Sequence, residues 1–556
     1  MSKALASAIL QKGPPALSGK TITYGTAGFR ANADMLECVM FRVGVVAALR
    51  SLQTHKMVGV MVTASHNPAA DNGSKIVDQD GGMLVHEWEV FATRLANSTD
   101  EADMSSTIDS FYPDFNSQAA GGSATVVLGR DTRVSSPKLA ELVKQGILTC
   151  GDRGGGVCRW HDTCGGEGAK VVDLGIVTTP QVHWAVLRAN QKGDGQVPPL
   201  QGYYEEHAQA LKVLLGSKQT NVKFHVDCAN GVGAKAVEEM NKTLSEHSIG
   251  FSLVPFNVGD GDPELLNEGC GAEHVQKSRK LPSGVPASGG NDKFASFDGD
   301  ADRVVVWYKK DSNLVLLDGD KIAALFSVYL CHLLDASKLK LSLGIVQTAY
   351  ANGSSTSFMS SVLAKHKENV TGEVSCVATG VKHLHHQALH YDIGVYFEAN
   401  GHGTVIFSDS ARSKIEERSR GGDAAAQTLH AFASLINPAI GDALSDLLAV
   451  MVVLEVEGIS LEQWAGYYED LPSIMTKVLV KDRNAIKTTK DEQRVTEPKE
   501  LQDAVDAAVS KVEQGRCFVR PSGTEDCVRV YAEAGKQETA NKLAEDVGTD
   551  ITFPSL

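Results

Sequence analysis

The sequence predicts an α/β protein built from several domains. Three apolar runs each end in a polar or glycine-rich turn and lead into sequence typical of a helix, which is the repeating unit of an α/β layer. These runs are residues 125–133, 223–233 and 342–353. The chain has 556 residues, a length that favours about three to five domains with ample core.

An earlier apolar strand, residues 57–62, leads into the run Thr63-Ala64-Ser65-His66-Asn67-Pro68. The Asn-Pro pair predicts a turn that closes the strand end and presents the Ser65 hydroxyl at the surface. A serine before His-Asn-Pro is by itself typical of an ordinary turn. The serine gains significance only from what the rest of the chain offers.

The second informative run is Phe297-Asp298-Gly299-Asp300-Ala301-Asp302-Arg303. Its three carboxylates alternate with Gly and Ala, and alternate side chains of an extended loop point the same way. Such a group of oxygens suits a hard cation such as Mg²⁺. A calcium-binding EF-hand is excluded because Arg303 and Lys309 stand where that motif has Gly and Glu. A solvated acidic turn is the alternative for this run alone.

The remaining elements follow from local signals. Residues 190–200 contain Gly and two prolines, which indicates a linker, and residues 304–317 predict a hairpin. Asp318 then predicts a helix cap before a helix over 321–334. After residues 470–472 the composition changes to short strands alternating with charged helices.

Composition limits the function classes. The net charge of −15 disfavours nucleic acid and anionic membranes as partners. The first 15 residues lack the apolar core of a signal peptide, and no apolar run is long enough to span a membrane. Ten cysteines without a regular framework favour reduced thiols in the cytoplasm. We interpret residues 158–164, with two Cys and one His, as a surface loop rather than a zinc site, and His383, His385 and His386 as a helix surface.

Two further motifs complete a recognisable series. Phe397-Glu398-Ala399-Asn400-Gly401-His402-Gly403-Thr404 and Arg520-Pro521-Ser522-Gly523-Thr524-Glu525 follow the serine and aspartate runs in the same chain. The four motifs in this order resemble the α-D-phosphohexomutase superfamily. Within it, the form of the Glu398 motif and the run Thr379-Gly380-Val381-Lys382-His383-Leu384-His385-His386 resemble the eukaryotic phosphoacetylglucosamine mutases. The resemblance extends from about residue 24 to residue 531.

The resemblance implies three related mixed α/β domains and a smaller C-terminal α+β domain around a central cleft. The expected boundaries are 1–190 with the phosphoserine loop, 191–311 with the metal loop, 312–462 with the sugar loop and 463–556 with the phosphate loop. The implied reaction interconverts N-acetylglucosamine 6-phosphate and 1-phosphate through a phosphoserine enzyme, with a hexose 1,6-bisphosphate as intermediate and activator. It would feed UDP-N-acetylglucosamine synthesis in a cytoplasmic monomer.

The residues then take expected roles. Ser65 carries the phosphoryl group, and Asp298, Asp300 and Asp302 hold Mg²⁺ together with a phosphoserine oxygen. His66, Lys75 and Arg30 remain open as the general base, and Arg303 and Lys75 meet phosphate charge. Glu398 accepts from two sugar hydroxyls, and Asn400 lies near the 2-substituent. The further substrate-binding residues that the resemblance implies are Thr379, Gly380, Ala399, His402, Arg520, Pro521, Ser522, Gly523, Thr524 and Arg529.

Three alternatives stay open. A phosphoglucomutase or phosphomannomutase would keep the fold and change the sugar. A metal-dependent phosphatase would use the serine and the metal but would not need a second phosphate site. A non-catalytic sugar-phosphate binder is disfavoured because Ser65, the three aspartates and Arg520 are all present.

Overall fold

The computed structural model describes residues 1–17, 19–25, 28–113, 123–150, 168–259, 262–287, 289, 292–311, 313–522 and 526–551. The chain forms two compact units. Unit 1 comprises Met1–Leu316 and Ser434–Val452, and unit 2 comprises Leu317–Ala433 and Val453–Leu556. No helix in the described ranges is long and apolar enough to cross a membrane.

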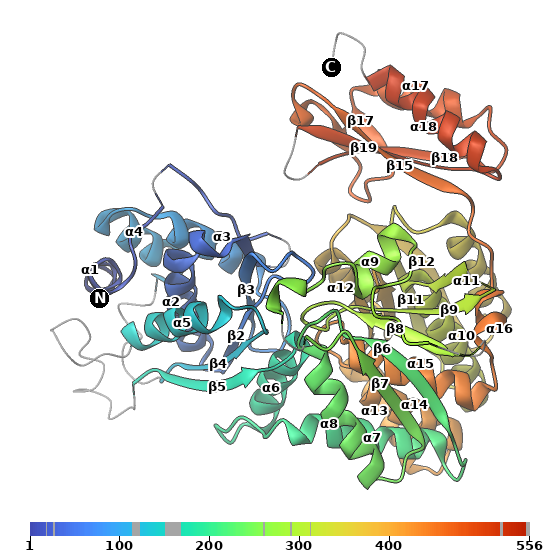
Figure 1. Cartoon of the computed structure of the whole chain (residues 1–556), viewed down its shortest axis with the longest axis horizontal. Coiled ribbons are helices and arrows are strands. Elements are labelled where there is room, and N and C mark those ends of the chain that lie inside the picture. Colours follow the sequence, from blue (N-terminus) through green and yellow to red (C-terminus); the bar gives the residue numbers. More distant parts are fainter. Residues whose placement is uncertain are drawn as a thin grey trace. The chain divides into compact units, whose positions relative to one another are not determined.

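Unit 1 begins with a mixed sheet of order β1-β3-β2-β4-β5 (Figure 1). Its strands are β1 (Phe29–Asn32), β2 (Val58–Val62), β3 (Asp71–Val77), β4 (Thr125–Arg130) and β5 (Lys170–Ile176). Its helices are α1 (Ser2–Lys12), α2 (Glu37–Thr54), α3 (His86–Asn97), α4 (Glu101–Phe111), α5 (Ser136–Thr149) and α6 (Thr179–Lys192). β2 pairs in parallel with β4, and β4 with β5, whereas β3 runs antiparallel to both β1 and β2.

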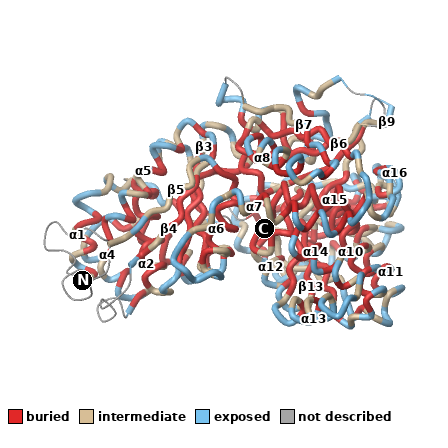
Figure 2. The backbone as a smooth tube through the Cα atoms, turned by 90° about the horizontal axis from the view of Figure 1, so that it is seen from below, coloured by how far each residue is buried: buried red, intermediate tan, exposed pale blue. Residues whose placement is uncertain are grey.

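Alternate residues of β2 face different helices, as the pleat of a strand requires. Val58, Val60 and Val62 belong to the core that contains α2 and α5. A Cβ atom at Gly59 would instead lie 3.0 Å from Val182 of α6. The sheet is therefore covered on both faces. Accordingly, α2 is buried along nearly its whole length; α13 (Asp409–Arg420), by comparison, is mostly exposed (Figure 2).

The second sheet of unit 1 has the order β10-β9-β8-β6-β7. Its strands are β6 (Val222–Asp227), β7 (Phe251–Phe256), β8 (Lys293–Phe297), β9 (Val304–Lys310) and β10 (Asn313–Leu317), and its helices are α7 (Gln201–Leu215), α8 (Gly233–Glu246) and α9 (Gly271–Ser278). β6 is parallel to β7 and β8, and β9 is antiparallel to β8. The expected hairpin over 304–317 is confirmed as β9 and β10.

Unit 2 contains a third mixed sheet, of order β12-β11-β13-β14. Its strands are β11 (Leu341–Thr348), β12 (Val370–Val377), β13 (Ile393–Phe397) and β14 (Gly403–Phe407). The helices along this stretch of chain are α10 (Gly319–Ser337), α11 (Gly353–Lys365), α12 (Val381–Ala388), α13, α14 (Ala424–Leu435), α15 (Ala443–Glu457) and α16 (Leu461–Ala465). The end of α14 and most of α15 belong to unit 1, which includes Ser434–Val452. The predicted cap is confirmed, because the Asp318 side chain accepts from the Lys321 amide at 3.4 Å.

The C-terminal part of unit 2 is an antiparallel sheet, β15-β19-β18, with a separate hairpin of β16 and β17. Its elements are β15 (Ser473–Leu479), β16 (Lys487–Thr488), β17 (Val495–Glu497), α17 (Lys499–Val509), β18 (Arg516–Pro521), β19 (Cys527–Glu533) and α18 (Gln537–Ile551). Apolar side chains of α17 and α18 form one core with those of β18 and β19. The three mixed sheets and this α+β part confirm the predicted fold class, and the strand-helix units expected at 125, 223 and 342 are β4–α5, β6–α8 and β11–α11.

Candidate active site

Ser65 lies in a tight turn directly after β2. The turn is closed by a hydrogen bond from the Asn67 amide to the Ala64 carbonyl at 3.0 Å, and Ser65 has a φ of 48°. Arg133, itself buried, donates to the carbonyl oxygens of Ser65 and Asn67 at 3.1 and 2.8 Å and pairs with Asp131. The Ser65 backbone is therefore fixed in a conformation that non-glycine residues rarely adopt, which is common where a side chain must be aimed.

The Ser65 side chain is buried, with 0% exposure, so the prediction that its hydroxyl lies at the surface is wrong. Its Oγ donates to Asp300 Oδ2 at 3.2 Å and accepts from Arg30 Nη2 at 3.1 Å. Neighbouring elements cover the strand end, a property that a linear motif does not reveal. A phosphoryl group at this position would lie against the Asp300 carboxylate, and two anions so close require a cation between them.

The aspartate run follows β8 and forms a turn rather than the expected extended loop. Ala301 has a φ of 57°, and its amide donates to the Asp298 carbonyl at 3.0 Å. The turn nevertheless brings the carboxylates together, because oxygens of Asp298, Asp300 and Asp302 all lie within 4.8 Å of one another and all three residues are buried. The flexible Gly-Ala spacers allow this closer arrangement.

Lys75 and Arg30 project from adjacent strands, since Arg30 on β1 pairs with Gly73 on β3. The Lys75 ammonium lies 2.7 Å from Asp300 Oδ2 and 2.6 Å from Asp302 Oδ2. Burial opposes the charge of Lys75, but the two carboxylates outweigh it and raise the Lys75 pKa above its ordinary value. For Arg30, burial and the nearby Arg303 lower the pKa. Lys75 thus stays cationic and offsets part of the aspartate charge.

The aspartates fit a hard divalent cation. Asp298 Oδ1 accepts from the amides of Asp302 and Arg303 at 3.1 and 3.3 Å, while Asp298 Oδ2 accepts no hydrogen bond from any described residue. Asp300 Oδ2 accepts from Thr179 Oγ1 at 2.5 Å, whereas Asp300 Oδ1 accepts none within the described ranges. Burial, then Asp302 and Asp300, raise the Asp298 pKa well above its ordinary value. Buried carboxylate oxygens with this geometry are ligands for Mg²⁺. Among the described residues, this is the cluster whose donor atoms meet closely enough for a metal.

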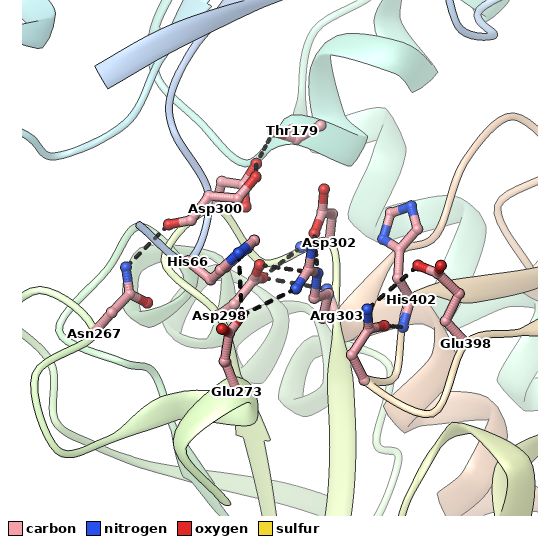
Figure 3. A network of polar contacts seen from close by, with 12 residues as sticks. His66, Thr179, Asn267, Glu273, Asp298, Asp300, Asp302, Arg303, Glu398 and His402 are labelled. Carbon is pink, nitrogen blue, oxygen red and sulfur yellow. Dashed lines mark hydrogen bonds and ion pairs between the residues drawn. The ribbon is translucent and has the colours of Figure 1, made fainter. Parts of the chain in front are cut away.

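His66 contacts Glu273 of α9. Its Nε2 lies 3.1 Å from Glu273 Oε2, and the same carboxylate oxygen is 3.3 Å from Arg303 Nη1 (Figure 3). Burial, followed by the nearby charges of Arg303 and Arg30, lowers the His66 pKa to about 2. The ring is therefore neutral, and donation from Nε2 to Glu273 leaves Nδ1, which is buried, with a lone pair.

In unit 2 the sugar-loop motif forms the connection between β13 and β14. The Glu398 amide donates to the His402 carbonyl, and the His402 amide donates to Asn400 Oδ1, both at 2.9 Å. Asn400 Nδ2 donates to Glu398 Oε2 at 3.3 Å. The Ala399 carbonyl accepts from Gly319 at the start of α10 at 3.4 Å. Internal hydrogen bonds therefore position the Glu398 carboxylate, which is only partly buried.

The phosphate-loop residues lie on β18 and β19. Arg520 and Arg529 are opposite each other in the antiparallel register, and the Ser522 amide donates to the Cys527 carbonyl at 2.9 Å. Pro521 ends β18. Gly523 and Thr524 lie outside the described residues. Thr379 and Gly380 precede α12, and Gly380 has a φ of 125° that favours glycine.

Six residues that contact the predicted motifs were not predicted from the sequence: Thr179, Asp131, Arg133, Asn267, Glu273 and Glu492. Asn267 Nδ2 donates to the Ser65 carbonyl at 3.0 Å. Asp131 and Arg133 follow β4, and this position at a strand end was the available signal. The others come from distant elements and carry no local pattern. The run at 158–164 lies outside the described residues. His383 and His386 lie exposed on α12 as expected, whereas His385 is partly buried and its Nδ1 lies 3.1 Å from the Tyr396 hydroxyl.

Four known family models match successive parts of the chain. The family described as "Phosphoglucomutase/phosphomannomutase, alpha/beta/alpha domain I" matches residues 37–103, and its "C-terminal domain" matches residues 475–549. Together with the serine turn and the aspartate cluster, these matches define an α-D-phosphohexomutase. Two more specific families, "Phosphoacetylglucosamine mutase AMG1, domain II" and "domain III", match residues 198–305 and 318–459. The chain belongs to the phosphoacetylglucosamine mutase family.

Individual relatives agree with this placement. The phosphoacetylglucosamine mutase of Sus scrofa is 44% identical over 547 residues, which cover 96% of this chain and 94% of that protein. A crystal structure of Aspergillus fumigatus N-acetylphosphoglucosamine mutase with GlcNAc-6P and magnesium has a TM-score of 0.86 at 38% identity and covers 98% of each chain. A second structure of the A. fumigatus enzyme, with glucose 1,6-bisphosphate, has a TM-score of 0.85 at 39% identity and covers 99% of this chain and 98% of that one.

Proposed function

We propose that the protein interconverts N-acetylglucosamine 6-phosphate and N-acetylglucosamine 1-phosphate. The observation that carries this proposal is the position of Ser65, whose Oγ lies 3.2 Å from a carboxylate oxygen of the buried aspartate cluster. A serine at such a site can hold a phosphoryl group, because a bound cation neutralises the phosphate oxygens beside the aspartates. The support from relatives is that the similar A. fumigatus enzyme has been crystallised with GlcNAc-6P and magnesium.

In the proposed reaction, phosphorylated Ser65 donates its phosphoryl group to a free sugar hydroxyl. The bond between phosphorus and Ser65 Oγ breaks as the bond to the sugar oxygen forms, and the hydroxyl proton passes to a base. The hexose 1,6-bisphosphate then turns over, and its other phosphate returns to Ser65 Oγ, which regenerates the phosphoenzyme. A trace of hexose bisphosphate serves as activator because it phosphorylates resting Ser65.

Asp298, Asp300 and Asp302 would hold Mg²⁺, together with an oxygen of phosphorylated Ser65. When bound, the ion supplies positive charge to the transferred phosphoryl group, which is the main electrostatic requirement of this chemistry. The aspartates themselves are oriented by the chain, since backbone amides and Thr179 bind their other oxygens. Lys75 and Arg303 add fixed positive charge at the same place.

The contacts of the three candidate bases differ. Lys75 is held between two carboxylates and Arg30 donates to Ser65 Oγ, so neither presents a lone pair. Because Glu273 binds Nε2, the acceptor of the neutral His66 ring is Nδ1. We propose that His66 Nδ1 accepts a hydrogen bond from the sugar hydroxyl and that Glu273 sets the tautomer of the ring. Because burial lowers the His66 pKa to about 2, the ring orients the hydroxyl rather than retaining its proton.

The sugar and its second phosphate are assigned to unit 2. Glu398 accepts from two ring hydroxyls, and Asn400, which uses one amide hydrogen and one acceptor position within its loop, keeps a second of each for the 2-acetamido group. Ala399, His402, Thr379 and Gly380 complete the sugar loops. Arg520, Pro521, Ser522, Gly523, Thr524 and Arg529 bind the non-reacting phosphate, with the two arginines supplying planar forks.

The test is phosphorus NMR of the protein with N-acetylglucosamine 6-phosphate, Mg²⁺ and a trace of glucose 1,6-bisphosphate. The proposal requires a growing 1-phosphate signal that depends on the bisphosphate and is absent for Ser65→Ala. Release of inorganic phosphate identifies a phosphatase, and unchanged spectra identify a binder. Faster turnover of glucose or mannose 6-phosphate would reassign the sugar, and each of these three results overturns the proposal.

The remaining expectations are also proposals. We propose that the four-part division at 190, 311 and 462 describes the domains, and that the product feeds UDP-N-acetylglucosamine synthesis. We also propose a cytoplasmic monomer. The net charge of −15 disfavours nucleic-acid partners, and the described cysteines, which form no disulfide with one another, fit a reducing compartment. Size-exclusion chromatography with light scattering and cell fractionation test these points.

A further inference from the structure

The turn between β16 and β17 places one carboxylate against two residues assigned to substrate. Glu492 Oε2 accepts from the Thr379 amide at 2.9 Å and from Thr379 Oγ1 at 2.7 Å. The same oxygen lies 2.7 Å from Arg520 Nε. One carboxylate oxygen therefore joins the loop before α12 to the end of β18, and all three residues belong to unit 2. The reaction proposed above gives Glu492 no role.

The hairpin tip is built to hold Glu492 in place. The Thr489 amide donates to the Arg494 carbonyl at 2.8 Å, the Glu492 amide donates to the Thr489 carbonyl at 3.0 Å, and Thr489 Oγ1 donates to Asp491 Oδ1 at 2.5 Å. Glu492 has a φ of 59°, in the left-handed region that a glutamate rarely adopts. An uncommon backbone conformation at a charged, partly buried residue favours a functional reason.

Electrostatics link Glu492 to the phosphate site. Burial opposes the charge of Arg520, but Glu492 outweighs it and raises the Arg520 pKa above its ordinary value. The side chains are 20% and 16% exposed, so water screens their attraction only in part. The close ion pair between Glu492 Oε2 and Arg520 Nε restricts the positions that the guanidinium can take. A fixed guanidinium plane is what bidentate phosphate binding needs.

We propose that Glu492 is a positioning residue of the distal phosphate site. It orients Arg520 and fixes Thr379 to it, so that residues of the third and fourth sequence domains act as one site. This inference rests on the proposed mutase function. The alternative is that Glu492 competes with phosphate for Arg520. In that case removing the carboxylate would lower KM, because two arginines would face the phosphate dianion without a counter-charge.

The experiment compares Glu492→Ala and Glu492→Gln with Glu497→Gln. Glu497 is an exposed carboxylate on the same hairpin, paired with Lys487 at 2.5 Å, and serves as the matched control. We expect Glu492→Ala to raise KM for N-acetylglucosamine 6-phosphate about tenfold, with a smaller fall in kcat and release of free bisphosphate. Glu492→Gln keeps an acceptor for Thr379 and should give an intermediate change. Because it is isosteric, it keeps the test valid if the alanine variant folds poorly.

A KM that falls in Glu492→Ala, or that matches Glu497→Gln, overturns the inference. A second readout does not depend on turnover: hydrogen exchange at the Thr379 amide should accelerate in Glu492→Ala and stay unchanged in Glu497→Gln. Thr379→Val combined with Glu492→Ala should raise log KM by less than the sum of the two single effects, since the residues share one contact. If wild-type protein shows no mutase activity, the proposed function fails; if wild type is active and Glu492 variants behave like the control, only this inference fails.

Discussion

Asp298→Asn should separate metal binding from fold stability. The two backbone hydrogen bonds to Asp298 reach Oδ1, so an asparagine can keep both with its carbonyl oxygen. Asp298 Oδ2, which accepts no hydrogen bond within the described chain, is the atom that changes. The substitution therefore removes one charge from the aspartate cluster with little change in shape.

The expected change in stability follows from the distances. Oxygens of Asp300 and Asp302 within 4.8 Å of Asp298 each repel it by at least about 3.5 kcal/mol at an effective dielectric constant of about 20. Arg303 Nε, 3.7 Å from Asp298 Oδ2, attracts it by about 4.5 kcal/mol on the same scale. The difference is about 2 kcal/mol of net repulsion at the 4.8 Å limit, and both Lys75 and proton uptake on Asp298 reduce it. Without metal, Asp298→Asn should be as stable as wild type or up to about 2 kcal/mol more stable.

The assay is thermal unfolding in EDTA and in excess Mg²⁺, with turnover measured on the same samples. At a metal concentration about 100 times Kd, wild type should gain about 2.7 kcal/mol, seen as a higher Tm. Asp298→Asn should lose most of this Mg²⁺-dependent rise and most of the turnover while its Tm in EDTA is equal or higher. A lower Tm in EDTA combined with an intact Mg²⁺ response would refute the reasoning, since Asp298 would then be a structural acceptor only.

Ser65→Ala should abolish turnover and, because the lost hydroxyl is buried and bonded, lower the free energy of unfolding by about 1 kcal/mol; retained turnover measured by phosphorus NMR contradicts the assignment. Gly319→Ala should lower kcat/KM at least tenfold, because its Cβ would lie 1.9 Å from the Glu398 carbonyl, whereas Gly466→Ala, with its nearest atom at 3.4 Å, should not. Burial and then Asp442 raise the Asp446 pKa well above its ordinary value. The stability that protonated Asp446 contributes is therefore complete below the unfolded-state pKa of about 4, and it is lost as the pH rises toward the folded-state pKa. Asp446→Asn should therefore raise Tm more at pH 8 than at pH 5, and a Tm difference that does not vary with pH excludes this.

The sequence by itself determined the local elements and the identity of the reactive residues. The apolar run before Ser65 and the alternating aspartates predicted a strand-end serine and a cation site, because such patterns depend on residues close together in the chain. The hairpin before Asp318 and its helix cap follow from the same local rules. The order of four motifs added the family, which the relatives confirm.

Only the tertiary structure decided how these residues meet. Ser65 is buried because β1 and β3 bring Arg30 and Lys75 over the end of β2, and Ala301 turns a run that alternation alone predicted to be extended. Neither Glu273 nor Glu492 belongs to a sequence motif. Glu273 contacts His66 from more than a hundred residues away in the chain, and Glu492 contacts Arg520 from a separate hairpin. Such contacts depend on how sheets and helices pack in three dimensions, and the order of residues along one strand or turn contains no information about them.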